Sequence, residues 1–221
     1  MDTPFAAVGG TLPASVPQFE KIGILGGTFD PPHLGHLYMA KTALTEFSLD
    51  EVILLPVGDP PHKRSQHVAT GEDRMTMLSL MRGEESSLTI SDMEIKRAGY
   101  TYTVDSLRRL TQTMPNAVFY YIIGEDTLYE LETWREHEKV FSLTEFICFA
   151  RPGGDGEKLW ATVEFFKRRY GKDIAVSRHS GPDISSSHIR ELIRQGCPTT
   201  GLLSENVRKY IDDKKLYRRR A

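Results

Sequence analysis

The sequence predicts an α/β protein with a doubly wound parallel sheet and helices on both faces. Short apolar runs alternate with longer helical patterns through most of the chain, and the first apolar run ends in paired glycines. Strands of a parallel sheet are buried on both faces, so they are continuously apolar rather than alternating. With 221 residues, the chain is long enough for one domain of generous size.

The composition is that of an ordinary globular protein, with 39% hydrophobic and 26% charged residues. A net charge of -2 gives no indication of bulk nucleic-acid binding, and no apolar stretch approaches the length of a membrane span. Cys148 and Cys197 lack metal-ligand spacing and predict no disulfide framework, which favours a reducing compartment. Residues 1–20 lack the features of a secretory signal, so we expect a flexible extension and a cytoplasmic protein.

Each expected element follows from a local pattern. Strands are predicted where apolar residues run together or alternate, at 21–27, 51–58, 88–96, 117–124, 145–151 and 173–177. Helices are predicted where apolar residues recur every three or four positions, as at Leu37, Ala40, Leu44 and Phe47. The helical ranges are 35–47, 72–83, 103–114, a region over 126–141, 156–171, 185–196 and 204–216.

Signals at the ends of these elements set the domain boundaries. Thr70 is a plausible cap for the helix at 72–83, and glycines close the helices at 156–171 and 185–196. The terminal run "KKLYRRRA" is most simply a solvated tail, with a nucleic-acid arm as the minority interpretation. We therefore expect one domain over 21–217 with a small C-terminal helical part, followed by a basic tail at 218–221.

The stretch "GGTFDPPHLGH" (26–36) follows the first strand, where ligands sit in open parallel sheets. Gly26 and Gly27 allow a sharp turn, and their amides together with the next helix N-terminus could bind an anion. His33 and His36 could donate hydrogen bonds to phosphate, and imidazolium would add positive charge. An ordinary turn with surface histidines is equally open from this stretch alone, whereas a zinc site has weaker support.

Two distant motifs together resemble a known superfamily. "GGTFDPPHLGHL" is similar to the His-x-Gly-His signature of the nucleotidyltransferases, and "ISSSHIR" (184–190) resembles their second motif at a late helix N-terminus. Both occur in the expected order, which is stronger support than either alone. The resemblance implies a Rossmann-like fold.

Three further stretches narrow the resemblance to the nicotinate-nucleotide adenylyltransferase family of bacterial type. They are "GDPPHK" (58–63), "RAGYTYTVDSL" (97–107) and "IIGEDTLYELETWRE" (122–136). The similarity extends over roughly 21–213. Glu125 and Asp59 depart from the residues common in the family, at positions on which the assignment does not depend.

The resemblance implies that the phosphate of nicotinate mononucleotide attacks the α-phosphorus of ATP, giving nicotinate adenine dinucleotide and pyrophosphate. Such a reaction needs alignment and charge stabilisation rather than a covalent enzyme intermediate. A magnesium ion would be held mainly by ATP phosphates and water, because no carboxylate cluster in the sequence suggests a protein metal site.

The same resemblance assigns the ATP phosphates to the two motifs. His33 and His36 would contact them, with His36 closest to the reacting phosphate, and Lys63 would reach the terminal phosphates unless it is simply a solvated loop residue. Arg190 would clamp the phosphate tail; otherwise it is an ordinary surface arginine. The remaining phosphate-binding positions are Gly27, Thr28, Phe29, Ile184, Ser185 and Ser186, where the two serines can also act as helix caps.

Two other groups of residues would bind the nucleosides. Gly124 would let the adenosine approach the backbone, and Asp126 would accept hydrogen bonds from ribose, although a helix-capping aspartate is an equal alternative on spacing alone. Trp134 would stack on the pyridine ring unless it is a core residue. The rest of the mononucleotide pocket would comprise Thr101, Tyr102 and Thr103, with weaker support for Arg135.

Other functions compete with this one. A sibling transferase could use nicotinamide mononucleotide, phosphopantetheine or a cytidylyl substrate, and the segments 97–107 and 122–136 argue against the last two. A class I aminoacyl-tRNA synthetase fragment would need a Lys-Met-Ser-Lys-Ser stretch, which the sequence lacks. A catalytically silent nucleotide sensor would keep the fold, but every expected catalytic position is occupied.

Overall fold

The computed structural model describes residues 20–58 and 69–218, so Lys63 lies outside the described residues. The strands are β1 (Glu20–Gly27), β2 (Glu51–Pro56), β3 (Leu88–Ile90), β4 (Ala117–Gly124), β5 (Glu145–Phe149) and β6 (Ile174–Val176). The helices are α1 (Leu34–Glu46), α2 (Gly71–Arg82), α3 (Thr103–Thr113), α4 (Glu125–Leu128), α5 (His137–Leu143), α6 (Gly156–Tyr170), α7 (Ser186–Gln195) and α8 (Glu205–Asp213), with a 3-10 turn η2 (Leu131–Thr133).

The strands form one six-stranded sheet in the order β3-β2-β1-β4-β5-β6. Every neighbouring pair is parallel. The chain winds outward in one direction from β1 to β3 and in the other from β4 to β6, which confirms the predicted doubly wound class. The direction reverses between β1 and β4, and open α/β sheets bind ligands outside the carboxyl ends of the strands at such a point.

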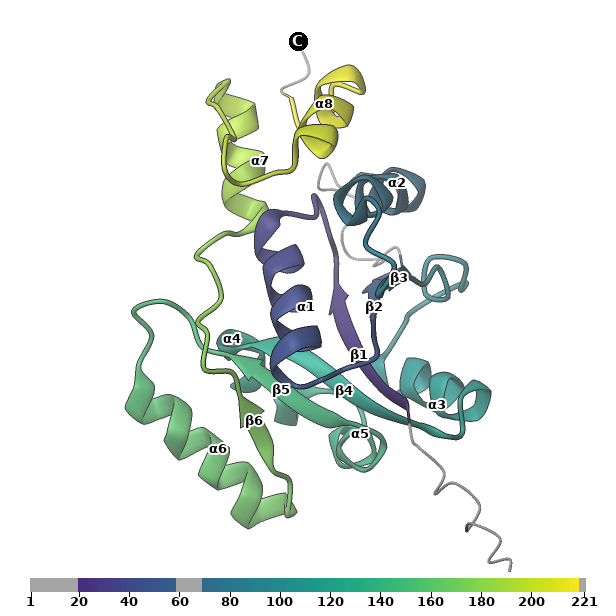
Figure 1. Cartoon of the computed structure of the whole chain (residues 1–221), viewed down its shortest axis with the longest axis vertical. Coiled ribbons are helices and arrows are strands. Elements are labelled where there is room, and N and C mark those ends of the chain that lie inside the picture. The colour runs from purple at the N-terminus through teal and green to yellow at the C-terminus, as the bar shows by residue number, and fades with distance from the viewer. Residues whose placement is uncertain (1–19, 59–68, 219–221) are drawn as a thin grey trace, which may run out of the picture.

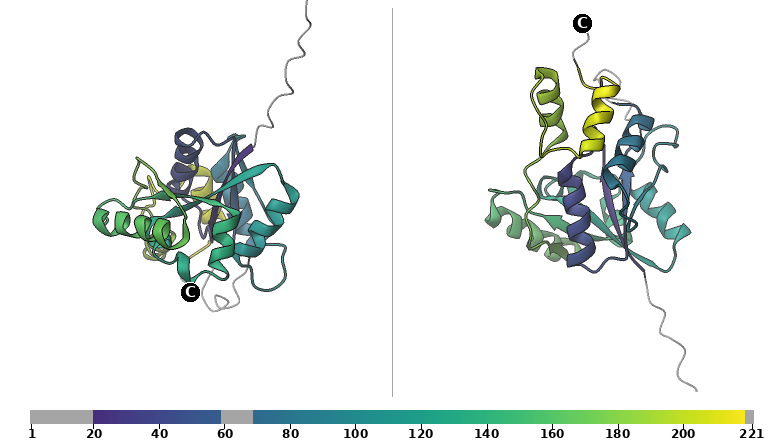
Figure 2. Two further views of the ribbon diagram at one scale, coloured as in Figure 1. Left: turned by 90° about the horizontal axis from the view of Figure 1, so that it is seen from below. Right: turned by 45° about the horizontal axis from the view of Figure 1, so that its top comes forward.

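Helices cover both faces of the sheet (Figures 1 and 2). Ile22 and Ile24 of β1 point into one buried cluster with α3, α5 and α6. Leu25 points into the other, with α1, α2, α7 and α8. Successive side chains of a strand face opposite sides, so a continuously apolar strand supplies both cores. Cys148 is fully buried in the first cluster.

Two elements differ from the sequence predictions. The strand expected at 88–96 ends at Ile90. Beyond it the chain turns, and Glu94 is buried with its carboxylate accepting a hydrogen bond from Ser106 Oγ. The helical region expected over 126–141 is divided into α4, η2 and α5. It cannot be continuous because Trp134 has extended backbone angles and Glu136 is left-handed, with φ 50°.

The helix ends agree better with the sequence. Thr70 caps α2 by accepting a hydrogen bond from the Asp73 backbone, and Gly171 and Gly196 are left-handed at the ends of α6 and α7. The solvated tail expected from residue 214 is wrong at Tyr217, which is buried. None of the helices in the described ranges combines the length and apolar character that a membrane span requires.

Candidate active site

The predicted phosphate loop lies at the carboxyl end of β1, beside the carboxyl end of β4. Gly27 ends β1 and Gly124 ends β4, so the loops that follow them meet at the point where the sheet reverses direction. In Figure 1 the helices α7 and α8 lie above the N-terminal end of α1. The segment between α7 and α8 contacts the first residue of α1, because Leu34 N–H donates a 2.9 Å hydrogen bond to the carbonyl of Leu202.

The two histidines form a stacked pair at the start of α1. His33 is the N-cap residue, and its ring centroid lies 3.6 Å from that of His36. The Nδ1 atom of His36 accepts a hydrogen bond from the His33 backbone N–H at 3.1 Å. Phe29 packs edge-on against His36, with ring centroids 4.8 Å apart. A neutral imidazole that accepts at Nδ1 carries its proton on Nε2, so His36 is pre-set to donate from Nε2.

Burial sets the charge of this pair. It lowers the pKa of His33 to about 4. It also lowers the pKa of His36 well below the usual value, with a smaller contribution from the neighbouring His33. Desolvation disfavours the charged form of an imidazole. Near pH 7 the structure therefore favours neutral rings that donate hydrogen bonds over the imidazolium expected from the sequence.

Close packing explains two glycines of the loop. A Cβ atom on Gly35 would lie 2.9 Å from Nδ1 of His33, and one on Gly26 would lie 2.2 Å from Oη of Tyr121. Neither distance is possible for a real Cβ without movement of a buried ring. Besides allowing the turn expected from the sequence, Gly26 therefore leaves room for the buried Tyr121 side chain.

The two sequence motifs meet in space. Ser186 Oγ donates a 2.9 Å hydrogen bond to the backbone carbonyl of Pro31. An Arg190 guanidinium NH donates to the backbone carbonyl of Asp30 at 2.7 Å. Ser185 caps α7 by accepting from the backbone of His188, so only the first of the two serines is a cap. The helix carrying the second motif, α7, is thus bonded directly to the loop at 28–33 between β1 and α1, here called the histidine loop.

Arg74 is a component of this site that the sequence analysis missed. Its side chain is fully buried, and one guanidinium NH donates to the backbone carbonyls of Thr28 at 3.0 Å and Val57 at 2.7 Å. It therefore joins the loops that follow β1 and β2. A signal was present, because Arg74 lies within the buried stripe of α2, between Gly71 and the apolar positions Met77, Leu78 and Met81.

A charged network surrounds the expected adenosine subsite. Asp126 forms a 3.2 Å ion pair with Arg151, which also contacts Asp183 at 3.3 Å. Gly124 is the N-cap of α4 and no side chain caps that helix, so the structure does not support a capping role for Asp126. Glu125, the departure noted in the sequence, is buried and accepts hydrogen bonds from Tyr129 Oη at 2.6 Å and from the Arg151 backbone at 2.8 Å.

The residues expected to bind the mononucleotide come from two segments that lie together. The Arg135 guanidinium is 4.5 Å from the centre of the Tyr102 ring. Trp134 is partly buried and packs edge-on against Tyr121, with ring centroids 5.5 Å apart. The contact between Arg135 and Tyr102 thus joins the segment before α3 to the segment after η2, as the sequence analysis requires.

Glu94 contacts this region, although no pattern in the sequence indicates it. Its carboxylate is buried and accepts hydrogen bonds from the side chains of Ser106 and Thr101 and from the backbone of Gly58. Burial raises the pKa of Glu94 despite these bonds. Glu94 lies in an alternating run that predicts a strand. The turn that buries it depends instead on contacts with α3, which the local sequence does not reveal.

Metal-binding groups are not concentrated at this site. Across residues 20–58 and 69–218, no three His, Cys, Asp or Glu side chains gather in a way that could hold a metal ion. The buried carboxylate of Asp30 already accepts hydrogen bonds from Ala69 and Tyr217, and Asp126 is paired with Arg151.

Comparisons with known proteins identify the family of the chain. The profile of the cytidylyltransferase-like family matches residues 24–192. A probable nicotinate-nucleotide adenylyltransferase of Desulfitobacterium hafniense is 42% identical over 202 residues, covering 90% of this chain and 96% of that protein. One from Halalkalibacterium halodurans is 37% identical over 200 residues, covering 90% and 92%.

Solved structures share the fold at lower identity. The Plasmodium falciparum nicotinic acid mononucleotide adenylyltransferase complexed with NaAD matches with a TM-score of 0.73 at 20% identity, over 90% of this chain and 97% of that one. A putative nicotinate-nucleotide adenylyltransferase from Vibrio parahaemolyticus matches with a TM-score of 0.63 at 19% identity, over 90% and 95%. From the extent and identity of the sequence matches, the chain belongs to the cytidylyltransferase-like family and, within it, to the nicotinate-nucleotide adenylyltransferases.

Proposed function

We propose that this chain transfers the adenylyl group of ATP to nicotinate mononucleotide, giving nicotinate adenine dinucleotide and pyrophosphate in NAD biosynthesis. The observation that carries the proposal is the direct bonding of the second motif to the histidine loop at the carboxyl end of β1. Relatives that match most of the chain are named for this activity. The reaction needs hydrogen-bond donors around a phosphate, which this loop can supply, and it needs no protein nucleophile.

The ATP phosphates would bind between the histidine loop and α7. His36 would donate from Nε2 to the reacting α-phosphate, and His33 would support it through the stacked contact and a second donor. Backbone amides of Gly27, Thr28 and Phe29, which precede α1 in the chain, would also bind phosphate, because a helix N-terminus favours an anion. A neutral imidazole can donate this hydrogen bond without becoming imidazolium, which suits a site where burial disfavours positive charge on the rings.

Arg190 would provide the positive charge that the histidines lack. Its guanidinium is anchored at the junction of the two motifs, where Ser185, Ser186 and Ile184 begin α7. Lys63, outside the described residues, would add a second cation at the β- and γ-phosphates. Both cations would stabilise charge on the pyrophosphate leaving group.

The adenosine would lie against Gly124 and Asp126. A Cβ atom built on Gly124 meets nothing within 4 Å among the described residues, and its φ of -86° is open to any side chain. Protein packing therefore does not require glycine there, which supports a requirement imposed by the ligand. Asp126 would exchange its ion pair with Arg151 for hydrogen bonds from ribose hydroxyls.

The mononucleotide would bind between the two segments joined by Arg135 and Tyr102. The flat face of Trp134 would stack on the pyridine ring, since its edge contact with Tyr121 holds the indole in place. Backbone amides near Thr101 and Thr103 would bind the carboxylate of nicotinate. The buried Glu94 carboxylate fixes Thr101 and would thereby shape this pocket.

Magnesium would enter with ATP. Nucleotide-transferring enzymes of this kind use a divalent metal ion with the triphosphate, and Mg²⁺ bound by phosphates and water suits a site without a carboxylate cage. When bound, it would neutralise charge on the phosphates. We also place the activity in the cytoplasm, in keeping with the free cysteines Cys148 and Cys197.

The test is pyrophosphate release from ATP and Mg²⁺, with nicotinate mononucleotide and nicotinamide mononucleotide compared side by side. A strong preference for the acid is expected. Equal use of both substrates would support the adenylyltransferase activity but contradict the proposed pocket of backbone amides for the nicotinate carboxylate. No release with either, alongside measurable ATP binding, would favour the catalytically silent nucleotide sensor.

A further inference from the structure

The buried carboxylate of Asp30, within the histidine loop, lies close to three distant parts of the chain. It is 2% exposed. Its Oδ1 atom accepts hydrogen bonds from the Ala69 backbone at 3.0 Å and from Tyr217 Oη at 2.7 Å. Its Oδ2 atom lies 3.8 Å from the Arg190 guanidinium. A buried carboxylate needs such partners, because desolvation without them is costly.

Arg190 is close to this carboxylate without being hydrogen-bonded to it. One guanidinium NH donates to the backbone carbonyl of Asp30 at 2.7 Å, and another donates to Ser187 Oγ at 3.1 Å. The 3.8 Å distance to Oδ2 exceeds that of a hydrogen bond. The guanidinium is thus aimed by neutral oxygens, and its charge is only partly compensated by Asp30.

Tyr217 comes just after α8 and is held in an unusual conformation. Its side chain is 8% exposed and its φ is 63°, in the left-handed region that tyrosine seldom occupies. Burial and the neighbouring Asp30 raise the pKa of Tyr217, so its hydroxyl remains a proton donor at all physiological pH values. We infer that the hydrogen bond to Asp30 helps to hold Tyr217 in this strained backbone conformation.

We propose that Tyr217 is a positioning residue for ATP, whose hydroxyl holds Asp30 Oδ1 so that the carboxylate does not pair fully with Arg190. The proposal rests on the function proposed above for Arg190. Without the hydroxyl, the buried carboxylate has lost one of its hydrogen bonds, and Arg190 is the cation beside it. A closer pair would neutralise Arg190 and withdraw it from the phosphate tail.

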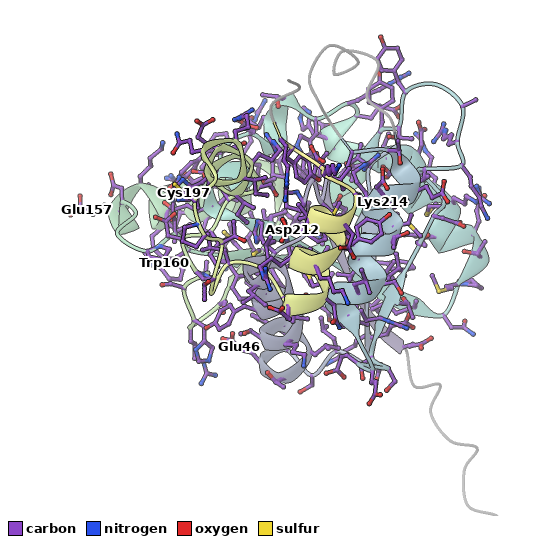
Figure 3. All side chains as sticks on the ribbon, turned by 90° about the horizontal axis from the view of Figure 1, so that it is seen from above. Glu46, Glu157, Trp160, Cys197, Asp212 and Lys214 are labelled. Atoms are coloured by element: carbon purple, nitrogen blue, oxygen red, sulfur yellow. The ribbon has the colours of Figure 1, made fainter. Side chains whose placement is uncertain are left out.

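A second tyrosine provides a matched control. Tyr210, on α8, donates from Oη to Asp73 Oδ1 of α2 at 2.8 Å. The bond is of the same kind and docks the same C-terminal segment, but it does not involve Asp30. Figure 3 shows α8 from above, with Asp212 and Lys214 labelled near its end. If Tyr217 only fastened the C-terminal segment to the domain, loss of either hydroxyl would have the same effect.

The experiment compares Tyr217→Phe and Tyr210→Phe with the full-length wild type, each assayed well below its unfolding midpoint. For Tyr217→Phe, the KM for ATP should rise about tenfold, as expected for loss of a hydrogen bond to a charged group, while the KM for the mononucleotide changes less than about twofold. Tyr210→Phe should leave both constants near wild type. Equal effects of the two variants on the KM for ATP would overturn the proposal.

Binding measurements separate this proposal from the proposed reaction. Calorimetric titration with ATP and Mg²⁺ in the absence of mononucleotide should show the same weakening in Tyr217→Phe, even if the acceptor substrate is another molecule. In an Arg190→Ala background, Tyr217→Phe should cause no further loss, since both substitutions act through one guanidinium. Additive losses would show that Tyr217 acts by another route.

A second variant covers the case in which Tyr217→Phe does not fold. In Asp30→Asn the carboxylate that competes for Arg190 is gone, so ATP affinity should stay within about twofold of wild type or increase. A tenfold loss of ATP affinity in this folded variant would contradict the competition between Asp30 and Arg190.

Discussion

Lowering the pH should destabilise the folded protein through His33. Burial lowers the pKa of His33 to about 4, against an ordinary value of 6.5 in the unfolded chain. Between these values the unfolded state binds more protons, so the free energy of unfolding falls as the pH falls. At pH 7 nearly all of this contribution to the free energy of unfolding is present. At pH 5, about 1.5 pH units below the unfolded pKa, about 2 kcal/mol of it is lost.

The measurement is urea unfolding at pH 7 and pH 5 for the wild type and His33→Gln. The variant should lose about 2 kcal/mol less between the two pH values, whatever its stability at pH 7. His188→Gln removes an exposed imidazole from α7 and should parallel the wild type. Parallel curves for His33→Gln and the wild type would refute the inference that burial keeps the His33 ring neutral.

Three further outcomes are expected. His36→Ala should retain the fold and lower kcat far more than ATP affinity, because its contact strengthens in the transition state; near-normal kcat would remove His36 from the mechanism. Trp134→Ala should mainly raise the KM for the mononucleotide, and an unchanged KM would show that the ring does not stack on substrate. Gly26→Ala should destabilise the fold by about 1–3 kcal/mol in thermal unfolding, because its methyl group would lie 2.2 Å from Tyr121 Oη. Tyr121→Phe in that background should recover part of the loss, and no recovery would locate the strain elsewhere.

The two arginines of the candidate site are each compensated by nearby carboxylates. Asp126 and Asp183 share Arg151, and Asp30 stands beside Arg190. Each cation is therefore partly compensated by a carboxylate before any phosphate arrives. Ligand binding would exchange these ion pairs for contacts with ribose and phosphate, so the net gain at each position is smaller than a bare cation would give.

The sequence alone determined the fold class and the position of the turn at 26–36, directly after the first strand. Continuous apolar runs imply strands buried on both faces, and their alternation with helices leaves a doubly wound sheet as the expected solution. Paired glycines after the first run and serines at a late helix start are local signals. Such signals predict the folded structure well because turns and caps depend on neighbouring residues, as the caps Thr70 and Ser185 show.

Only the tertiary structure decided which groups surround that loop. The strand expected through 88–96 ends at Ile90, and the turn that follows buries the side chain of Glu94 against α3. Asp30 meets Tyr217 from 187 residues away, and Arg74 joins the loops after two strands. Charge states also changed, because burial makes the His33 and His36 rings neutral. Contacts between distant residues and desolvation depend on the whole packed chain, so no local pattern in the sequence specifies them.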